Sequence, residues 1–417
     1  MDNIKAVILA AGLGTRMKSD IPKVLHPAGS GTMLGEIVGS LKEAGIKDIV
    51  VVVGYGAGLV RDAFAGEGLC FVEQKELLGS GDALKCAVEA MGDLTGHVLV
   101  TCGDTPLITA DTYKRLIRGH AEGNASCTLL TCGMEDPSSY GRIVRDERGN
   151  IRKIVEEKDA ADEEKKIREV NAGTYGFRGA ELREFIRDIE INAKKKEFYL
   201  TDMADILARN GKKVLSEPCP PDEALGVNSR KDLAVVNRIL NQRVIERLMG
   251  SGVTIIDPAT TYIDKSAVIE KDTTILPCTV IKPGVTIASG CRIGPFARLR
   301  PGTTLSRGVE IGNFVELCRT EIGENTKVKH HTYLGDTVVG SNVNIGAGTI
   351  TANYDGEKKA RTVIKDRAFI GVGVILIAPV EIGREARVGA GSVVTKNRNV
   401  PDGETVVGIP ARPLKKS

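Results

Sequence analysis

The sequence lacks the uninterrupted run of about 18 apolar residues that a membrane-spanning helix needs. Its nine cysteines include no Cys-x-x-Cys pair, which argues against a disulfide framework or a zinc site, so we expect reduced thiols in a cytoplasmic protein. The net charge of +3 is too balanced to indicate nucleic acid or an anionic membrane as the main partner. The short apolar run at the N-terminus leads into a glycine-rich turn, so we interpret it as a buried strand and not as a signal peptide.

A length of 417 residues predicts two domains. In the first half, strand-like and helix-like segments alternate, which predicts a mostly parallel, Rossmann-like α/β sheet with helices on both faces. The expected strands are 5–11, 48–53, 98–101 and 128–131, and the spacing of apolar residues in 33–44 predicts a helix. In such sheets, ligands bind beyond the carboxyl ends of the strands.

One long helix is expected between the two halves. Residues 229–249 contain no proline or glycine and place apolar residues at helical spacing, with Asn228 and Ser229 as candidate caps and Gly250 as a candidate end. We therefore expect domains at 1–228 and 251–417, joined by a linker helix at 229–250. The same helix could instead be the last helix of the first domain.

The second half repeats with a period of six residues. An aliphatic residue recurs at every sixth position from Ile263 to Leu317 and, after one-residue slips, onward to Val406. A helix has a period of 3.6 and a strand a period of two, so neither explains a period of six, whereas a triangular coil of three short strands does. The repeat predicts a left-handed parallel β-helix of hexapeptide repeats. The polar segment 351–363 interrupts it, and we expect a projecting loop there.

A glycine-rich loop follows the first expected strand. The backbone N–H groups of such a loop can approach phosphates closely, and Arg16 and Lys23 add positive charge suited to a triphosphate. The loop is neither a complete GxGxxG motif nor a Walker motif. Asp104 follows the strand expected at 98–101, after Cys102 and Gly103, and is a candidate ligand for a hard cation such as Mg²⁺.

The stretch from Leu9 to His26 resembles the signature of sugar-1-phosphate nucleotidyltransferases. More narrowly, nearly the whole chain resembles the bifunctional N-acetylglucosamine-1-phosphate uridyltransferase/glucosamine-1-phosphate acetyltransferase family of bacterial cell-envelope synthesis. Further matching segments are 78–81, 103–107, 140–143, 154–159, 171–173, 199–202, 226–228, 312–316, 330–336 and 353–356. The resemblance implies an enzyme that makes UDP-N-acetylglucosamine with Mg²⁺, UTP and acetyl-CoA.

The resemblance also implies roles for residues of the first half. Arg16 and Lys23 would neutralise phosphate charge as catalytic residues, and Asp104 and Asn228 would hold Mg²⁺. The implied contacts to UTP and the UDP-sugar are Leu9, Ala11, Gly12, Gln74, Gly79, Ser80, Gly141, Glu156, Asn171 and Asn228. A thymidylyl- or guanylyltransferase remains the rival interpretation of this half.

In the second half, the resemblance implies that His330 is the general base of acetyl transfer. A neutral imidazole suits the deprotonation of an amine near pH 7. The implied acceptor-site residues are Arg300, Tyr333, Asn344, Asn353, Tyr354 and Lys359, and the implied acetyl-CoA contacts are Ala390 and Arg412. Because β-helices of this family pack as trimers whose neighbouring chains complete the site, we expect a homotrimer.

The second half departs from the family pattern at three places. Cys318, followed by Arg319, stands where the family has a lysine, Val372 replaces a serine, and 408–412 resembles general hexapeptide acyltransferases. The β-helix is also short before Ile293. Alternatives therefore stay open: a changed acyl acceptor, or a uridylyltransferase whose β-helix is a trimerisation scaffold or sugar-nucleotide sensor. On an extended strand, Arg319 would point away from the face of Cys318, unless the coil bulges or the side chain curls back.

Overall fold

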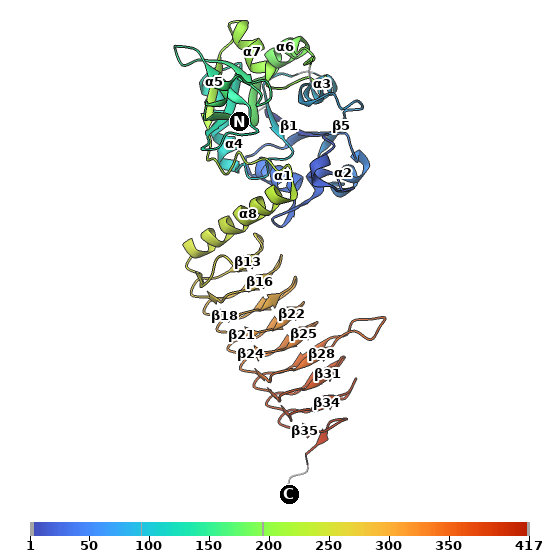
Figure 1. Cartoon of the computed structure of the whole chain (residues 1–417). Helices are drawn as coiled ribbons and strands as arrows, with labels where there is room; N and C mark the ends of the chain where they lie inside the picture. The colour runs from blue at the N-terminus through green and yellow to red at the C-terminus, as the bar shows by residue number, and fades with distance from the viewer. Residues whose placement is uncertain (1–3, 93, 194–195, 415–417) are drawn as a thin grey trace. The chain divides into compact units, whose positions relative to one another are not determined.

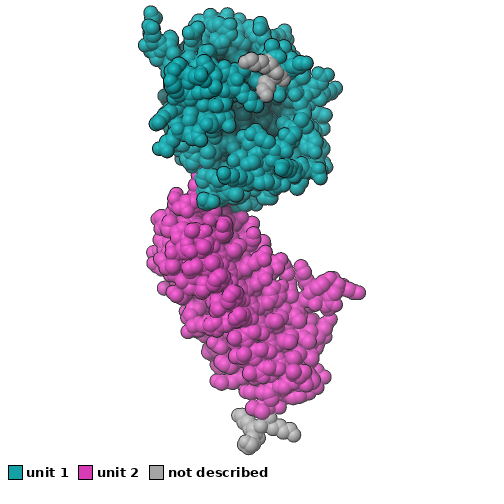
Figure 2. Space-filling view, in the orientation of Figure 1, with its two compact units in different colours: residues 1–240 teal, residues 241–417 magenta. Residues whose placement is uncertain are grey.

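The computed structural model of the chain describes residues 4–92, 94–193 and 196–414. The chain divides into two compact units, residues 1–240 and 241–417, which Figure 2 colours separately. The helix predicted over 229–249 is present as α8 (Arg230–Gly250), which crosses this division (Figure 1). At its start, Ser229 N donates to Asp232 Oδ2 at 2.8 Å and Asp232 N donates to Ser229 Oγ at 3.3 Å, a reciprocal cap.

Unit 1 contains a nine-stranded sheet whose main path is β11-β7-β10-β6-β1-β4-β5. These strands are β1 (Ile4–Ala10), β4 (Asp48–Val53), β5 (Cys70–Glu73), β6 (His97–Cys102), β7 (Cys127–Gly133), β10 (Glu169–Arg178) and β11 (Val214–Pro218). All neighbours on this path are parallel except β10, which is antiparallel to both β6 and β7. The hairpin of β8 (Arg142–Arg145) and β9 (Ile151–Val155) extends from β10. The predicted mostly parallel sheet is confirmed.

Helices cover both faces of this sheet. They are α1 (Met33–Glu43), α2 (Ala57–Ala63), α3 (Ser80–Ala90), α4 (Ala110–Glu122), α5 (Asp162–Lys165), α6 (Gly179–Phe185) and α7 (Asp202–Arg209). Successive side chains of a strand point to opposite faces, so Ala6 and Ile8 of β1 pack in the core beneath α1 and α4, whereas Val7 packs in the core beneath α3, α6 and α7. Among the described residues, no helix is long and apolar enough to cross a membrane.

Unit 2 is a β-helix built from three sheets. The first contains β12 (Thr254–Ile255), β15 (Thr274–Ile275), β18 (Arg292–Ile293), β21 (Glu310–Asn313), β24 (Lys327–His330), β27 (Asn344–Ile345), β30 (Phe369–Ile370), β33 (Arg387–Val388), β35 (Thr405–Val407) and β36 (Arg412–Pro413). The second contains β13 (Tyr262–Ile263), β16 (Val280–Ile281), β19 (Arg298–Leu299), β22 (Glu316–Cys318), β25 (Tyr333–Gly335), β28 (Ile350–Ala352), β31 (Ile375–Ile377) and β34 (Val393–Val394). The third contains β14 (Val268–Ile269), β17 (Thr286–Ile287), β20 (Thr304–Leu305), β23 (Glu321–Ile322), β26 (Thr337–Val339), β29 (Thr362–Ile364) and β32 (Val380–Ile382).

One continuous core fills the β-helix, and every aliphatic position of the predicted six-residue repeat from Ile263 to Val406 belongs to it. The one-residue slips are shortened coils: Leu299 pairs with Leu317, whereas Leu305 pairs with Ile322, one position sooner. The projecting loop is shorter than predicted, because strand pairing continues to Ala352 and resumes at Thr362 (Figure 1). The left-handed hexapeptide β-helix is the architecture of this unit.

Candidate functional site

The loop after β1 turns at Gly14 and lies against Lys23. Gly14 has φ of 60°, a left-handed conformation that favours glycine, and a Cβ atom there would lie only 2.8 Å from Cβ of Lys23. The short 3₁₀ turn that follows, Thr15–Met17, carries Arg16. A second 3₁₀ turn, Lys23–Leu25, begins with Lys23. Glycine at position 14 therefore lets two cationic side chains from neighbouring turns approach the same place.

Four predicted residues from three distant segments meet there. Lys23 Nζ donates to Asp104 Oδ2 at 2.6 Å and to Asn228 Oδ1 at 3.0 Å, and Arg16 Nη2 donates to the same Asn228 oxygen at 2.7 Å. Asp104 follows β6, and its carbonyl oxygen accepts from Val227 N at 2.8 Å, which holds the segment before α8 beside it. The carboxylate of Asp104 and the amide oxygen of Asn228 thus converge on one ammonium group.

Asp104 and Asn228 fit a hard divalent cation. Both offer oxygen atoms, and both oxygens already contact a single positive group, so the position between them favours a cation. Across residues 4–92, 94–193 and 196–414, no three His, Cys, Asp or Glu side chains are grouped to hold a metal ion. An Mg²⁺ ion held by these two side chains would therefore take its other ligands from phosphate groups and water, which is the usual coordination of Mg²⁺ in phosphate-binding sites.

A pocket of about 390 Å³ opens beside these residues, at the carboxyl ends of β1 and β6. The predicted residues that line it are Leu9, Ala11, Gly12, Lys23, Gln74, Gly79, Ser80 and Asp104. Gln74 is held in place, because its Nε2 donates to the carbonyl of Gly79 at 3.0 Å and to Asp82 Oδ2 at 2.7 Å. The pocket therefore joins the glycine loop to the segment that starts α3.

The pocket wall also contains residues that sequence reasoning missed. They include Leu13, Leu77, Cys102 and Glu197. Leu13 and Leu77 adjoin the recognised motifs, so proximity in sequence was a usable signal for them, but Glu197 comes from a distant segment. The thiol of Cys102 is no candidate nucleophile, since burial raises its pKa to about 12.

The predicted sugar contacts form a second cluster that does not line this pocket. Asn171 N donates to the carbonyl of Gly141 at 2.9 Å, and a Cβ atom at Gly141 would lie 3.6 Å from Glu156 Oε1. That carboxylate oxygen accepts from Thr201 Oγ1 at 3.1 Å. Burial raises the pKa of Glu156, and burial together with Asp205 and Glu156 raises the pKa of Asp202 to about 6.

In unit 2, His330 lies on β24 and pairs in register with Asn313 of β21. Its Nδ1 donates to Asn313 Oδ1 at 2.8 Å, which leaves the lone pair on Nε2. Both residues line a pocket of about 270 Å³ together with Arg292, Glu310 and Lys329. Asn313 received no role from the sequence, because its contact with His330 depends on a coil register that only the paired strands define.

The other predicted residues of unit 2 do not line the pocket beside His330. Arg300 Nη1 donates to Glu316 Oε1 at 3.1 Å, and Glu316 pairs in register with Tyr333 of β25. The remaining predicted residues lie on strands, turns and the projecting loop: Asn344 on β27, Asn353, Tyr354 and Lys359 in the loop after β28, Ala390 after β33, and Arg412 on β36. Arg300, the residue after β19, and Tyr333 of β25 thus both neighbour Glu316, whereas Ala390 and Arg412 lie near the end of the coils.

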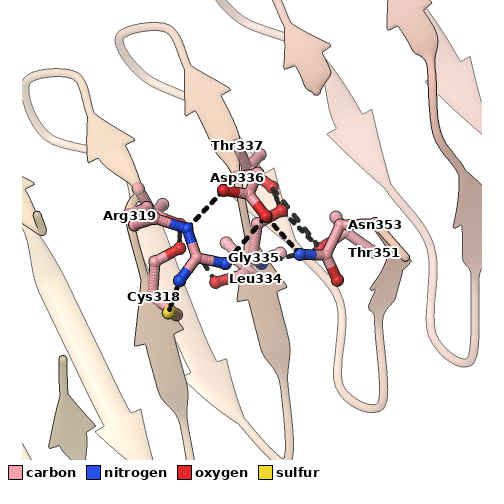
Figure 3. Close-up of polar contacts among 9 residues, drawn as sticks. Cys318, Arg319, Leu334, Gly335, Asp336, Thr337, Thr351 and Asn353 are labelled. Carbon is pink, nitrogen blue, oxygen red and sulfur yellow. Dashed lines mark hydrogen bonds and ion pairs between the residues drawn. The ribbon is translucent and has the colours of Figure 1, made fainter. Parts of the chain in front are cut away.

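The chain leaves the extended conformation after β22, which is the alternative that the sequence left open for Arg319. Arg319 has φ of 50° and does not continue the strand, so its side chain is not forced to the face opposite Cys318. Its Nη1 lies 2.9 Å from the sulfur of Cys318, which is buried (Figure 3). A left-handed corner in a shortened coil therefore turns the guanidinium back over the thiol.

The comparisons with known proteins agree with both units. The MobA-like NTP transferase domain matches residues 6–164, and the bacterial transferase hexapeptide family (six repeats) matches residues 266–301 and 361–396. The Bifunctional protein GlmU of Caldanaerobacter subterraneus subsp. tengcongensis is 41% identical over 440 residues, covering 98% of this chain and 95% of the relative. The protein of the same name from Geotalea uraniireducens is 44% identical and covers 96% and 95%, respectively. The protein of the same name from Pelobacter propionicus is 43% identical, covering 98% of this chain and 96% of the relative. The chain belongs to the family of the bifunctional protein GlmU.

Proposed function

We propose that the chain makes UDP-N-acetylglucosamine by two reactions, one in each unit. Acetyl transfer from acetyl-CoA to glucosamine 1-phosphate belongs to unit 2, and Mg²⁺-dependent uridylyl transfer from UTP to N-acetylglucosamine 1-phosphate belongs to unit 1. The observation that carries the proposal is the convergence of Arg16, Lys23, Asp104 and Asn228 beside the pocket at the strand ends. The functional domains that we propose are 1–228 and 251–417, with 229–250 as the linking helix.

In uridylyl transfer, an oxygen of the sugar phosphate attacks the α-phosphorus of UTP, the bond to the β-phosphate oxygen breaks, and pyrophosphate leaves. The attacking oxygen is already anionic, so the protein contributes alignment and charge neutralisation rather than a covalent intermediate. Arg16 and Lys23 approach the pocket with positive charge and stabilise the negative charge of the triphosphate. Mg²⁺, when bound to Asp104 and Asn228, supplies further neutralisation of that charge.

Recognition of the two substrates is divided between the pocket and the second cluster. Gln74, held by Gly79 and Asp82, faces the uracil with a fixed amide, and Ser80 lies beside the ribose. Gly141, Glu156 and Asn171 form the contact surface for the N-acetyl sugar. Burial raises the pKa of Glu156, and Thr201 Oγ1 donates to its carboxylate at 3.1 Å.

In acetyl transfer, the amine of glucosamine 1-phosphate attacks the thioester carbonyl of acetyl-CoA. A C–N bond forms, the C–S bond breaks, and coenzyme A leaves. His330 Nε2 takes the proton from the attacking nitrogen, and Asn313 holds the imidazole in the tautomer that makes this possible. Arg300, Tyr333, Asn344, Asn353, Tyr354 and Lys359 bind the acceptor, and Ala390 and Arg412 bind acetyl-CoA.

The spread of these residues over one β-helix supports a homotrimer in which neighbouring chains complete the site. The pocket beside His330 contains none of the proposed acceptor or acetyl-CoA contacts, so a single chain presents the site in separate parts. We also place the protein in the cytoplasm, since all nine cysteines are free thiols and suit a reducing compartment.

One coupled assay tests the proposal. Purified protein is incubated with glucosamine 1-phosphate, acetyl-CoA, UTP and Mg²⁺, and the products are resolved by mass. We expect UDP-N-acetylglucosamine only with all four components, and N-acetylglucosamine 1-phosphate when UTP is omitted. Conversion of supplied N-acetylglucosamine 1-phosphate without acetylation of glucosamine 1-phosphate would instead establish a uridylyltransferase with a β-helix scaffold. Replacing UTP by dTTP or GTP tests the rival nucleotide choices.

A further inference from the structure

Arg319 and Asp336 occupy the same corner of the β-helix in successive coils. Cys318 of β22 pairs with Gly335 of β25, and the next residue of each strand turns into the left-handed region, with φ of 50° at Arg319 and 51° at Asp336. This stacking lets the two side chains run alongside each other. Arg319 Nε lies 2.5 Å from Asp336 Oδ1, and Nη2 lies 2.9 Å from Oδ2 (Figure 3). Two parallel hydrogen bonds of this kind define a specific geometry as well as an ion pair.

Asp336 in turn holds both ends of the projecting loop, residues 353–361. Its Oδ2 accepts from Nδ2 of Asn353, the first residue of the loop, at 2.5 Å (Figure 3). Its backbone carbonyl accepts from Thr362 N, directly after the loop, at 3.2 Å. Inside the loop, Ala360 N donates to the carbonyl of Asn353 at 2.8 Å, and Tyr354 pairs with Lys359. One aspartate therefore connects the outgoing and returning strands of the loop that contains three proposed acceptor contacts.

All three nitrogen atoms of the Arg319 guanidinium donate hydrogen bonds at this corner. Nε and Nη2 donate to Asp336, and Nη1 donates to the sulfur of Cys318 at 2.9 Å. The Arg319 hydrogen bonds hold the pKa of Asp336 below its ordinary value, so the carboxylate stays ionised. A lysine in place of Cys318 would put a second positive charge where the thiol now meets the guanidinium, and like charges at that distance repel. Cys318 and Arg319 are therefore a matched pair.

The same network reaches Tyr333. Gly335 directly precedes Asp336, and a Cβ atom at Gly335 would lie 2.5 Å from the hydroxyl oxygen of Tyr333 and 2.7 Å from Nδ2 of Asn353. The absence of a side chain at this position lets both groups pack over the same backbone. Movement of Asn353 would thus remove a neighbour of the Tyr333 hydroxyl.

We propose that Arg319 is a positioning residue: with Asp336 it forms a clamp that holds in place the loop 353–361, which contains three of the proposed acceptor contacts. The thiol of Cys318 leaves room for the guanidinium of that clamp. The kinetic consequence for the acceptor rests on the acetyl transfer proposed above, whereas the anchoring of the loop rests on the contacts alone. The two parts can therefore be tested separately.

Hydrogen exchange of the intact protein, followed by mass spectrometry, tests the anchoring. We expect Arg319→Ala and Asp336→Asn to speed exchange at Ala360 and Thr362 by about tenfold, as loss of a hydrogen bond to a charged group predicts. Arg319→Lys should restore part of the protection.

Arg367→Ala is the matched control. Arg367 and Glu385 form the same kind of corner pair, with φ of 56° and 57° and Nε 2.7 Å from Oε1. Arg367 lies at the corner between β29 and β30, whereas the loop lies between β28 and β29, so loss of this pair should leave exchange in 353–362 unchanged. Wild-type protection of the loop in Arg319→Ala would overturn the clamp.

Steady-state kinetics test the consequence for the reaction. Arg319→Ala should raise KM for glucosamine 1-phosphate about tenfold and leave uridylyl transfer unchanged. A raised KM with unchanged loop exchange would mean that Arg319 binds the substrate phosphate directly, and would overturn the positioning role. If wild-type protein shows no acetyl transfer, the proposed function fails, and hydrogen exchange still decides the clamp.

A double variant tests the matched pair. Cys318→Lys should weaken acetyl transfer, because its ammonium meets the guanidinium of Arg319, and adding Arg319→Ala to it should recover part of the loss. Cys318→Ser, which keeps a small neutral side chain, serves as the control and should behave like the wild type. Improved acetyl transfer in the single Cys318→Lys variant would contradict the pairing.

Discussion

The ammonium of Lys23 lies 2.6 Å from a carboxylate oxygen of Asp104, although the two residues are 81 positions apart. The side chains are 14% and 30% exposed, so the pair is only partly screened by water. Lys23 also reaches Asn228, and these contacts tie the turn after the glycine loop to the end of β6 and to the segment before α8. A change of charge at Lys23 or at Asp104 should therefore affect all four residues that we propose to bind phosphate or Mg²⁺ beside the pocket.

Asp104→Ala should lower kcat/KM of uridylyl transfer by at least about 10²-fold, the scale of losing one key electrostatic contact in a transition state. The variant removes a proposed cation ligand and the carboxylate partner of Lys23, which keeps only its contact with Asn228. Pyrophosphate release measures the effect, and acetyl transfer in the same sample should stay unchanged. Asp111→Ala removes an exposed carboxylate on α4 and serves as the control. Wild-type-like turnover in Asp104→Ala would exclude Asp104 as a metal ligand.

Removal of divalent cations should separate the two reactions. With EDTA in excess, we expect uridylyl transfer to stop, since only two protein oxygens are proposed to hold the ion and a chelator competes readily with them. Acetyl transfer needs no metal in our proposal and should continue, as measured by thiol release from acetyl-CoA. Added Mg²⁺ should restore the first reaction. Loss of both activities under chelation would argue against independent sites.

His330→Ala should reduce acetyl transfer by about 10² to 10⁴-fold, the range for a general base. Asn313→Ala should cause a smaller loss of acetyl transfer. His330 remains as the general base but loses the hydrogen bond that selects its tautomer. His331→Ala is the neighbouring control, since the His331 ring stacks on Phe314 and the backbone hydrogen bond of His331 to Asn313 is kept in the variant. Uridylyl transfer should be normal in all three variants. Equal losses in the His330 and His331 variants would point to a folding defect.

Burial, together with the neighbouring His97, lowers the pKa of His120 to about 4. Because the folded-state pKa lies below that of the unfolded chain, this histidine stabilises the fold above pH 6.5 and loses that contribution as the pH falls from 6.5 to about 4. The difference corresponds to about 3 kcal/mol in the free energy of unfolding. Urea denaturation between pH 7 and pH 4 measures it.

His120→Asn is the variant that tests this assignment. It can keep a hydrogen bond to Thr128 Oγ1, which His120 Nδ1 makes at 3.0 Å, but it cannot take up a proton. The variant should be less stable at pH 7 and should lose less stability on acidification than the wild type. Parallel pH profiles for the two proteins would rule out His120 as the source.

Sedimentation should give a mass of about three times 44.5 kDa, the mass of one chain. The reason is that one β-helix presents the proposed acetyl-transfer residues in separate parts, which neighbouring copies would bring together. Dilution should lower acetyl transfer in step with dissociation. A concentration-independent monomer with full acetyl transfer would refute this assembly.

Local sequence determined most of the architecture. The strand predicted at 48–53 is β4 (Asp48–Val53), and every position of the six-residue repeat is buried in the core of unit 2. The repeat could be predicted from the sequence because every coil places the same requirement on a few neighbouring residues. On each face, one apolar side chain must point inward and the chain must turn at the corner. Motif spacing likewise placed Asp104 at a strand end.

Tertiary structure decided which of those residues meet. The contact of Lys23 with both Asp104 and Asn228 depends on the order of strands in the sheet, and the pairing of Asn313 with His330 depends on a shortened coil. The bond between Arg319 and Asp336 needs left-handed corners in two successive coils, whereas the sequence left both an extended strand and a bulge open at Arg319. Such contacts join residues that are far apart in the sequence. They depend on strand register and on where the chain reverses, which many distant interactions set together, so no local sequence pattern marks them.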